Sequence, residues 1–371
     1  MKNKKFQIFF DCGSSKIRAG AFDSHDSKNN FYYESKFFHN YFDIQNEIQK
    51  IISSVEKDTN EYLNDINLMV DSPDILSVGI SISKKLNGSI LKKDDIKFLI
   101  QDAKQQVLRN YTNHNISHIV IKNYKIDKVD YTFLPNETIC NLISLDILFI
   151  CLPKETIEYF KEQFSILDIS INQIYCSSFT KSINYKNNFS SVKNVSFIDM
   201  GFNKTSIVSY NDNNIAFLDV LPLGGNHITK DLAEILKIDL LEAEKIKLLF
   251  DKNENYLHEN KLSLDLIQKI IFARIEEILE LSSKSIKLNS NLILPNDHKM
   301  ILMGEGSKIL DNKFKEKILF FHQIDLLDEE TEDICQSGRN INEEPSKQEV
   351  VIIPKKQIKQ GFFEKLFHFF K

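Results

Sequence analysis

The chain has 371 residues and a mass of 43.2 kDa, and 42% of its residues are hydrophobic, which excludes wholesale disorder and predicts more than one lobe. Its net charge of −5 argues against a nucleic-acid binder, which usually presents a basic surface. Five scattered cysteines without a C-x-x-C pair, and no apolar run long enough to span a bilayer, predict a soluble cytoplasmic body.

The first predicted element is a β-hairpin in KFQIFFDCGSSKIRAGAF, where an apolar strand, a polar turn and a second strand follow one another. Gly13, Ser14 and Ser15 offer backbone N–H groups and hydroxyls, and Lys16 adds a positive charge. Such a turn can bind phosphate oxygens, because glycine lets a ligand approach the backbone closely. Asp11 at the strand end is placed to hold a water on Mg²⁺.

In the segment from LSVGISISKKLNGSI to HIVIKNYKIDK, Asn87–Gly88 predicts a two-residue hairpin turn between strands.

A second hairpin is predicted in NVSFIDMGFNKTSIVSY, again with an aspartate before the turn. Asp199, Gly201 and Thr205 repeat the chemistry of the first hairpin about half a chain later. One Asp-Gly turn is weak evidence, and separate ordinary turns are the alternative. Two related hairpins predict a duplicated lobe with the phosphates of one nucleotide held between them.

Apolar residues at helical spacing predict helices over 227–238, 240–250 and 266–286. Glu244 and Lys247, three residues apart, fit a solvated surface pair on this pattern alone. The strand MILM then runs into Gly304, Glu305, Gly306 and Ser307, and a helix with Ser307 as its N-cap is predicted to follow.

Residues 325–348 are polar and acidic, which predicts a tether with little order. Lysines follow, and GFFEKLFHFFK at 361–371 predicts an amphipathic helix too short to span a bilayer. One arc of roughly 160° gathers its apolar residues, which are Phe362, Phe363, Leu366, Phe367, Phe369 and Phe370. A membrane interface with anionic headgroups suits this face, and docking on the protein's own core is the alternative.

The ordered set of two phosphate hairpins, G-G-x-x-x-T, A-E-x-x-K and G-x-G-S resembles the FtsA family of the actin, Hsp70 and sugar-kinase ATPase superfamily. Three features narrow the resemblance to that family: the first hairpin DCGSSKIRA, the segment that begins at residue 76, and the tail. The resemblance extends from residue 6 to 371. It implies an α/β, two-lobed actin-like ATPase fold with an inserted family-specific subdomain and a C-terminal amphipathic helix.

The resemblance implies ATP and Mg²⁺ as cofactors, with Asp11 and Asp199 holding the metal through water. The residues implied to bind the nucleotide are Asp11, Gly13, Ser14, Ser15, Lys16, Asp199, Gly201, Asn203, Thr205, Gly224, Gly225, Thr229, Glu244, Lys247, Gly304, Gly306 and Ser307. Glu244 and Lys247 would contact ribose and adenine. Phe202, Asn203 and Glu305 depart from the family pattern, and no general base can be assigned, so slow or absent hydrolysis is expected.

The resemblance also implies a division of the chain into subdomains. The first lobe would comprise 1–82 with 161–194, the inserted subdomain 83–160, and the second lobe 195–228 with 297–324. A helical subdomain would cover 229–296, a flexible linker 325–360 and the membrane-targeting helix 361–371.

The implied function is a cell-division scaffold that polymerises on the cytoplasmic face of the inner membrane at the division site, tethers FtsZ and recruits later division proteins. FtsZ would dock on the helical subdomain, where Arg274 and Glu277 are either a partner contact or an exposed ion pair. The inserted subdomain would serve self-association. The alternatives are an actin-like pilus-assembly protein and a small-substrate kinase of the same superfold.

Overall fold

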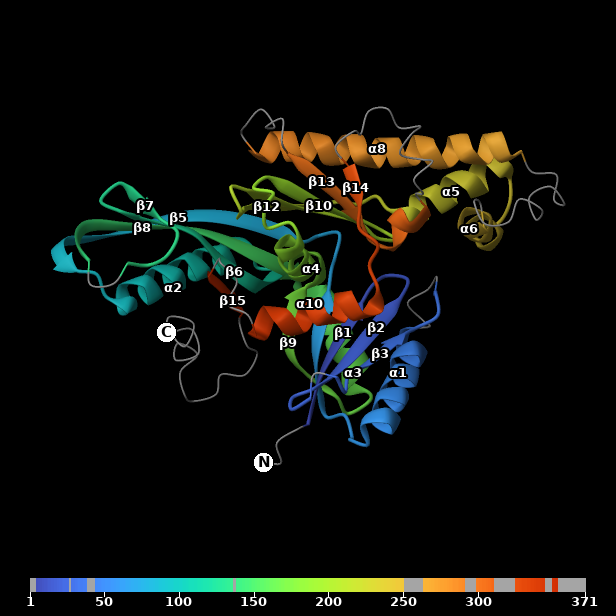
Figure 1. Ribbon diagram of the computed structural model, residues 1–371, viewed down its shortest axis with the longest axis horizontal. Helices are drawn as coiled ribbons and strands as arrows, with labels where there is room; N and C mark the ends of the chain where they lie inside the picture. Colours follow the sequence, from blue (N-terminus) through green and yellow to red (C-terminus); the bar gives the residue numbers. More distant parts are fainter. Residues whose placement is uncertain are drawn as a thin grey trace. The chain divides into compact units, whose positions relative to one another are not determined.

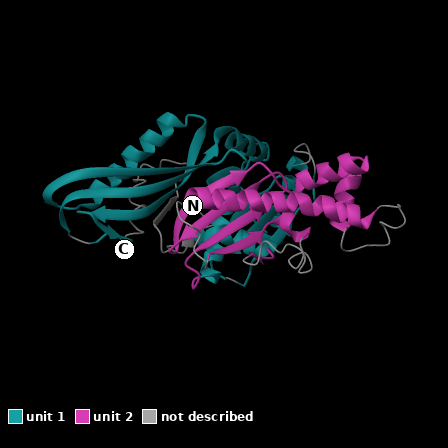
Figure 2. Ribbon diagram, turned by 90° about the horizontal axis from the view of Figure 1, so that it is seen from above, with its two compact units in different colours: residues 1–189, 330–371 teal, residues 190–329 magenta. Residues whose placement is uncertain are grey.

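The computed structural model describes residues 5–26, 28–38, 44–135, 138–249, 263–290, 298–309, 324–343 and 349–352. The chain divides into two compact units, one of residues 1–189 with 330–371 and one of residues 190–329 (Figures 1 and 2). The predicted amphipathic helix at 361–371 lies outside the described residues. None of the described helices is long and apolar enough to cross a membrane.

The first unit is built on a five-stranded sheet with the order β3-β2-β1-β4-β9. The strands are β1 (Phe6–Cys12), β2 (Ile17–Asp23), β3 (Phe31–Glu34), β4 (Asp65–Val70) and β9 (Ser170–Cys176). β1, β2 and β3 pair antiparallel, whereas β4 runs parallel to β1 and β9 parallel to β4. Because parallel strands end at the same edge, the residues that follow β1, β4 and β9 come together there.

Helices pack against this sheet. They are α1 (Ile44–Thr59), α3 (Lys154–Ser165), α4 (Ser177–Asn188) and α10 (Thr331–Glu343). α1 forms because isoleucines and a valine recur at helical spacing and are buried together, namely Ile44, Ile48, Ile51, Ile52 and Val55.

Helix α10 corrects the prediction of a flexible linker at 325–360. It packs against α4 and against the β1 and β2 strands of the first sheet. Ile334 and Cys335 are buried, and Gly338 lies so close to Met69 and Phe9 that a larger side chain would overlap them. The buried residues of α10 include only two large apolar side chains, Ile334 and Ile341, beside small Cys335 and Ser337, so the helix does not stand out from its acidic composition.

A second sheet of the first unit corresponds to the predicted inserted subdomain and has the order β15-β6-β8-β5, with β7 paired to β6 (Figure 1). Its elements are β5 (Leu76–Ile90), α2 (Lys93–Asn110), β6 (His114–Ile126), β7 (Val129–Tyr131), β8 (Ile139–Pro153) and β15 (Glu349–Ile352). Apart from β15, it spans 76–153 rather than the predicted 83–160. β15 pairs antiparallel with β6, so this part of the predicted linker is also a strand.

The prediction of a hairpin turn at Asn87–Gly88 is wrong. Both residues have positive φ, 51° and 82°, as an Asn-Gly turn requires. The chain nevertheless continues along the same partner, because Lys85 pairs with Leu142 and Ser89 with Cys140. The two residues therefore form an irregularity within β5 instead of reversing the chain.

The second unit repeats the first sheet. Its order is β12-β11-β10-β13-β14, with strands β10 (Val195–Met200), β11 (Thr205–Asn211), β12 (Asn214–Leu221), β13 (Lys299–Met303) and β14 (Ile324–Leu326). The pairings again run antiparallel on the hairpin side and parallel on the other. The duplicated arrangement predicted from the two hairpins is thereby confirmed.

Three described helices complete the second unit, α5 (Gly225–Leu236), α6 (Leu240–Leu249) and α8 (Leu264–Ser290), as the apolar periodicity predicts. Helical Ile228, Ile271 and Ile278 share one hydrophobic cluster with strand residues Ile198 and Ile207. Among the described residues, the helices predicted as a separate subdomain thus share a core with the sheet.

Candidate functional site

The two central hairpins have the same geometry. In each, an aspartate is the second-last residue of the strand, and a four-residue turn follows. The glycine that opens the turn donates its N–H to the carbonyl of the lysine that closes it, from Gly13 to Lys16 at 3.0 Å and from Gly201 to Lys204 at 2.9 Å. The sequence similarity between the two segments therefore reflects one local structure, present once in each unit.

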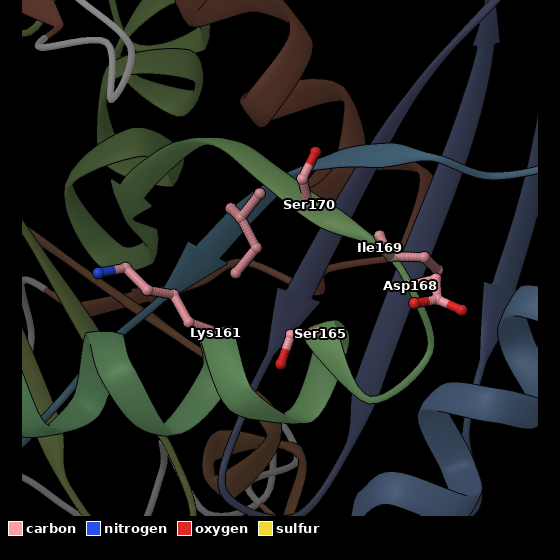
Figure 3. A pocket seen from close by; sticks show the side chains of 6 residues that line it. Lys161, Ser165, Asp168, Ile169 and Ser170 are labelled. Carbon is pink, nitrogen blue, oxygen red and sulfur yellow. The ribbon is translucent and has the colours of Figure 1, made fainter.

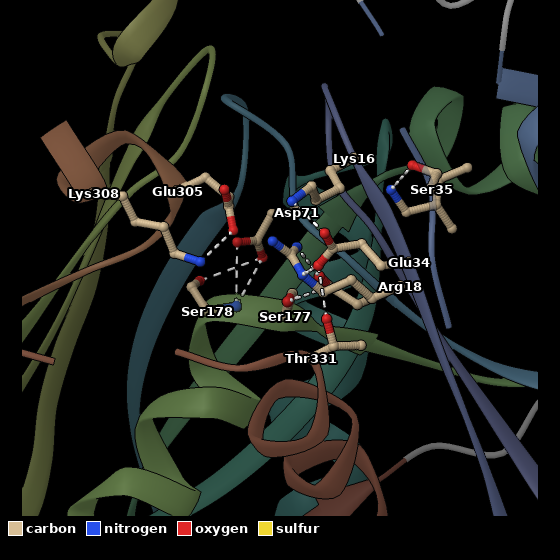
Figure 4. Close-up of polar contacts among 12 residues, drawn as sticks. Lys16, Arg18, Glu34, Ser35, Asp71, Ser177, Ser178, Glu305, Lys308 and Thr331 are labelled. Atoms are coloured by element: carbon tan, nitrogen blue, oxygen red, sulfur yellow. Dashed lines mark hydrogen bonds and ion pairs between the residues drawn. The ribbon is translucent and has the colours of Figure 1, made fainter. Parts of the chain in front are cut away.

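Asp11 is buried at the carboxyl end of β1. Ser177, the first residue of α4, donates its hydroxyl to Asp11 Oδ1 at 2.6 Å, and Arg18 Nη1 lies 3.5 Å from Asp11 Oδ2. Figure 4 labels Arg18 and Ser177, the two partners of this carboxylate. The bonds hold the carboxylate in one orientation, which a group that holds a hydrated metal ion requires.

Asp71 is a further carboxylate at this edge, and it was not predicted from the sequence. It follows β4 and accepts bonds from Ser178, with N–H and Oγ at 3.2 and 3.3 Å, and from Cys176 Sγ at 3.3 Å (Figure 4). Burial raises the pKa of the Cys176 thiol, which keeps it a donor. The available signal was an acidic residue directly after the apolar strand DINLMV. A carboxylate there can orient water or accept a proton.

Lys16, predicted to face phosphate, pairs with Glu34 Oε1 at 2.5 Å in the described structure. Thr331 of α10 also donates to Glu34 Oε2, at 2.7 Å (Figure 4). Burial alone would raise the Glu34 pKa, but the bonds from Lys16 and Thr331 outweigh it and lower that pKa. Lys16 would have to exchange this carboxylate for a phosphate in order to act as predicted. Ser14 and Ser15 lie in the turn beside it.

In the second unit, the three glycine clusters come together around the hairpin turn. A Cβ on Gly224 would lie 2.5 Å from the Gly201 carbonyl oxygen, and one on Gly306 would lie 2.8 Å from the Met200 oxygen. Gly304 has φ of +94°, and a Cβ there would overlap the Asp199 carboxylate. Gly304 is therefore required both for backbone conformation and for space.

Hydrogen bonds attach the start of α5 to the same turn. The Gly225 N–H donates to the Gly201 carbonyl at 2.9 Å, and the Asn226 N–H donates to the Phe202 carbonyl at 2.7 Å. The Asn226 side chain donates to Asn203 Oδ1 at 3.0 Å. The predicted residues Gly201, Asn203, Gly224 and Gly225 thus form one compact structure.

Thr205 was expected at the phosphates, but its fully buried hydroxyl donates to the Leu223 carbonyl at 2.8 Å. The hydroxyl therefore ties β11 to the segment before α5. In this arrangement Thr205 supports the turn from inside the unit.

Glu244 and Lys247 form a buried pair, so their interpretation as a solvated surface pair is wrong. Their exposed fractions are 4% and 7%, and Lys247 Nζ lies 2.6 Å from Glu244 Oε2. Lys247 also donates to the Gly225 carbonyl at 3.0 Å and to Thr229 Oγ1 at 2.9 Å. Burial lowers the pKa of Lys247, although the Glu244 charge opposes that shift. Its ammonium lies 5.5 Å from the centre of the Phe202 ring, so Phe202 has a packing role in the turn.

The predicted helix after Gly304 is a 3-10 helix, Glu305–Ile309, within the described residues. Ser307 lies inside it and donates its hydroxyl to the Gly304 carbonyl at 2.7 Å, so Ser307 is not an N-cap. Glu305 pairs with Lys308 at 3.1 Å (Figure 4). This ion pair partly neutralises the carboxylate that departs from the family pattern.

Arg274 holds two helices of the second unit together. Its Nε and Nη2 lie 2.6 and 2.9 Å from the two carboxylate oxygens of Asp231 on α5, and its Nη1 lies 2.5 Å from Glu277 Oε2. Such a bidentate pair is directional and strong for its exposure. Arg274 therefore has a structural partner, in addition to any partner protein it contacts.

A separate open cavity of about 570 Å³ lies in the first unit, between the end of α3 and the start of β9 (Figure 3). Its lining residues are Lys161, Ser165, Asp168, Ile169, Ser170 and Ile171. None of the predicted site residues lines it, and β9 separates it from Ser177. Within the described ranges, no three His, Cys, Asp or Glu side chains are grouped to hold a metal ion.

Comparison with known proteins agrees with these features. The family model "Cell division protein FtsA" matches residues 196–296, which begin at the second hairpin and include α5, α6 and α8. FtsA of Buchnera aphidicola subsp. Schizaphis graminum is 22% identical over 286 residues, covering 70% of this chain and 67% of that protein. Over these ranges the chain is similar to FtsA cell-division proteins. FtsA of Bacillus subtilis is 30% identical over 141 residues, covering 33% of this chain and 30% of that protein.

Among solved structures, the PilM–PilN type IV pilus biogenesis complex is similar, with a TM-score of 0.64 and 12% identity over 88% of this chain and 89% of that chain. Together with the duplicated sheets, this similarity identifies an actin-like α/β fold. The alignment to FtsA of Buchnera aphidicola subsp. Baizongia pistaciae covers 64% of that relative's length. The chain thus spans about two thirds of the length of these two Buchnera relatives.

Proposed function

We propose that this FtsA-like protein binds ATP with Mg²⁺ and acts as an actin-like scaffold in cell division. The observation that carries the proposal is the repeated hairpin, with a buried aspartate before a glycine-opened turn at the end of the central strand of each duplicated sheet. Backbone N–H groups in such turns bind phosphate oxygens, and carboxylates hold hydrated magnesium.

The residues present fit these groups. Asp11 and Asp199 would hold magnesium through water, and Asp71 stands beside the first of them as a carboxylate already oriented by Ser178. Magnesium would offset the phosphate charge. The Glu244–Lys247 pair would contact ribose and adenine, since it is positioned against the α5 backbone at Gly225. We expect hydrolysis to be slow or absent.

We further propose that the protein attaches to the cytoplasmic face of the inner membrane at the division site. The support is the sequence pattern of the phenylalanine-rich segment at 361–371. A short helix of this kind binds membranes weakly, so self-assembly into filaments would strengthen the attachment through avidity.

Tethering of FtsZ and recruitment of later division proteins are also part of the proposal. The second unit exposes apolar side chains on α5 and α6, namely Ile235, Leu240, Leu241 and Leu248. Exposed apolar side chains on two neighbouring helices support a protein-binding surface there. Glu277, about half exposed beside Arg274, could add a polar contact at its margin.

A pilus-assembly role is the second candidate, and the similarity to the PilM–PilN complex favours it. That similarity concerns the fold alone. The family model and the phenylalanine-rich segment both favour the division scaffold.

The test of ATP binding is a titration of the full chain with ATP and Mg²⁺ by calorimetry. We expect Asp11→Ala and Asp199→Ala each to weaken binding by about 10- to 100-fold, as loss of a metal-orienting group does. Asp94→Ala is the matched control, because Asp94 is 82% exposed on α2. Unaltered affinity in both hairpin variants would refute the assignment, and equal loss in Asp94→Ala would show a nonspecific effect.

A further inference from the structure

The inserted sheet contacts the candidate phosphate site of the first unit through two neighbouring residues of β6. Ser117 donates its hydroxyl to the Ile174 carbonyl of β9 at 2.9 Å. His118 Nε2 accepts the N–H of Cys176 at 2.9 Å, in a fully buried position. Successive strand residues normally point to opposite faces. Here the pairing of β6 with β8 shifts between Ile116 and His118, and this bulge lets both side chains reach β9.

The residue that His118 holds lies at the junction of β9 and α4. Cys176 is the N-cap of α4, and the next two residues hold the two carboxylates of the site. Ser177 donates to Asp11, and Ser178 donates to Asp71. A displacement of the Cys176 backbone would therefore move the donors of both carboxylates.

The chemistry of His118 is unusual for a core residue. Burial lowers its pKa to about 3, although the Asp71 charge opposes the shift, so the ring is neutral at physiological pH. Because Nε2 accepts a hydrogen bond, the ring proton is on Nδ1. That atom is buried and has no hydrogen-bond partner in the described structure. An unpartnered buried N–H is costly, so an apolar residue would suit the position better if packing were its only task.

We propose that His118 is a positioning residue, which fixes the start of α4 so that Ser177 and Ser178 orient Asp11 and Asp71. It packs edge-on against Phe179 at 4.8 Å between ring centres, which keeps the imidazole in place. The bulged strand thereby links the inserted sheet to the phosphate hairpin. The consequence for ATP affinity rests on the proposed function, but the positioning itself does not.

The test uses variants that separate hydrogen bonding from packing. In His118→Gln the amide oxygen occupies nearly the place of Nε2 and can accept from Cys176, whereas in His118→Asn it lies nearer the place of Nδ1 and cannot. His118→Leu removes the unpartnered Nδ1–H and leaves the Cys176 N–H unpartnered instead. We therefore expect little change in its thermal unfolding midpoint.

The first readout is hydrogen exchange of the nucleotide-free full chain, followed by mass spectrometry over 176–182. We expect exchange to accelerate by about fivefold or more in the asparagine and leucine variants and to stay near wild type in the glutamine variant. Peptides over 195–211 in the second unit are the internal control. Equal exchange in all four proteins, or acceleration in the glutamine variant equal to that in asparagine, would overturn the proposal.

The second readout is affinity for ATP with Mg²⁺. We expect a loss of about 5- to 50-fold for asparagine and leucine, and recovery with glutamine. Wild-type ATP affinity in the folded leucine variant would overturn the coupling between His118 and the nucleotide site. If the wild type bound no ATP, the proposed function would fail, while the exchange readout would still decide the positioning role.

Should the asparagine and leucine variants not fold, the wild type supplies the measurement. Coupling is reciprocal, so ATP should slow exchange over 114–122 as well as over 176–182. ATP binding without slowing over 114–122 would overturn the proposal.

Discussion

Two adjacent glycines allow a sharp test of the structure around the second hairpin. We predict that Gly224→Ala strongly destabilises the second unit and that Gly225→Ala does not. A Cβ on Gly224 would lie 2.5 Å from the Gly201 oxygen, 2.7 Å from the Phe202 oxygen and 2.8 Å from the Lys204 nitrogen. These are backbone atoms of a paired turn, so they cannot turn aside as a flexible side chain would. The Gly224 backbone is extended, and the cost is therefore one of space alone.

The magnitude follows from what must move. Relief of the overlap pushes α5 away from the turn and stretches the hydrogen bonds from Gly225 to Gly201, at 2.9 Å, and from Asn226 to Phe202, at 2.7 Å. Overpacking costs about 1–3 kcal/mol and each of the two weakened hydrogen bonds about 1 kcal/mol, so about 3–5 kcal/mol is expected. A Cβ on Gly225 would meet Lys247 Nζ at an ordinary 3.6 Å, and the change should stay below about 1 kcal/mol.

The assay is native-state hydrogen exchange in urea, because a chain of two units need not unfold in one transition. Peptides over 195–211 and 225–249 report the second unit, and peptides over 65–70 and 170–188 serve as the reference. The reasoning is refuted if Gly224→Ala loses no more stability than Gly225→Ala. It is also refuted if both units lose stability equally.

Two other predictions follow from single contacts, and a third follows from the sequence of residues 361–371. Lys247→Met leaves the Glu244 carboxylate buried without its cation, and should cost the second unit about 3–5 kcal/mol of stability, measured by urea unfolding. Adding Glu244→Gln should restore much of that stability. Strictly additive losses in the double variant would contradict the pairing. Asp23 accepts the His25 N–H and an Asn29 amide hydrogen, which lowers its pKa, so its stabilisation is complete above about pH 4 and lost as pH falls. Asp23→Asn should flatten that acid limb of the unfolding profile, and an unchanged limb would argue against it. Phe363→Glu should abolish co-sedimentation with anionic liposomes while leaving thermal unfolding unchanged, and retained binding would exclude the membrane anchor.

Local features of this chain could be predicted from sequence, and long-range ones could not. Neighbouring residues are enough to predict both hairpins, since apolar strands flank an Asp-x-Gly turn. Asn87–Gly88 carries an equally clear local signal, and the backbone adopts the expected conformation. The chain fails to reverse there because Ser89 pairs again with β8, which only the distant strand determines.

In the candidate site, too, local features could be predicted from sequence and long-range contacts could not. The glycines that contact the second turn stood out because glycine is rare in this chain. Their mutual contacts, and the burial of Glu244 with Lys247, depend on how α5 and α6 pack against the turn. Asp71 and His118 were missed because each acquires its role from the α4 start, more than fifty residues away in sequence. Such roles follow from sheet order rather than from a motif.

Strand β15 has a consequence for how far the molecule can stand from a lipid surface. If residues 325–360 were an unstructured tether, the phenylalanine-rich segment at 361–371 could lie more than about 100 Å from the folded units. With Glu349–Ile352 paired to β6, eight residues separate the inserted sheet from residue 361, a reach of at most about 29 Å. If residues 361–371 bind lipid as proposed, this short connection would keep the inserted sheet near the bilayer, and only separation of β15 from β6 would lengthen it.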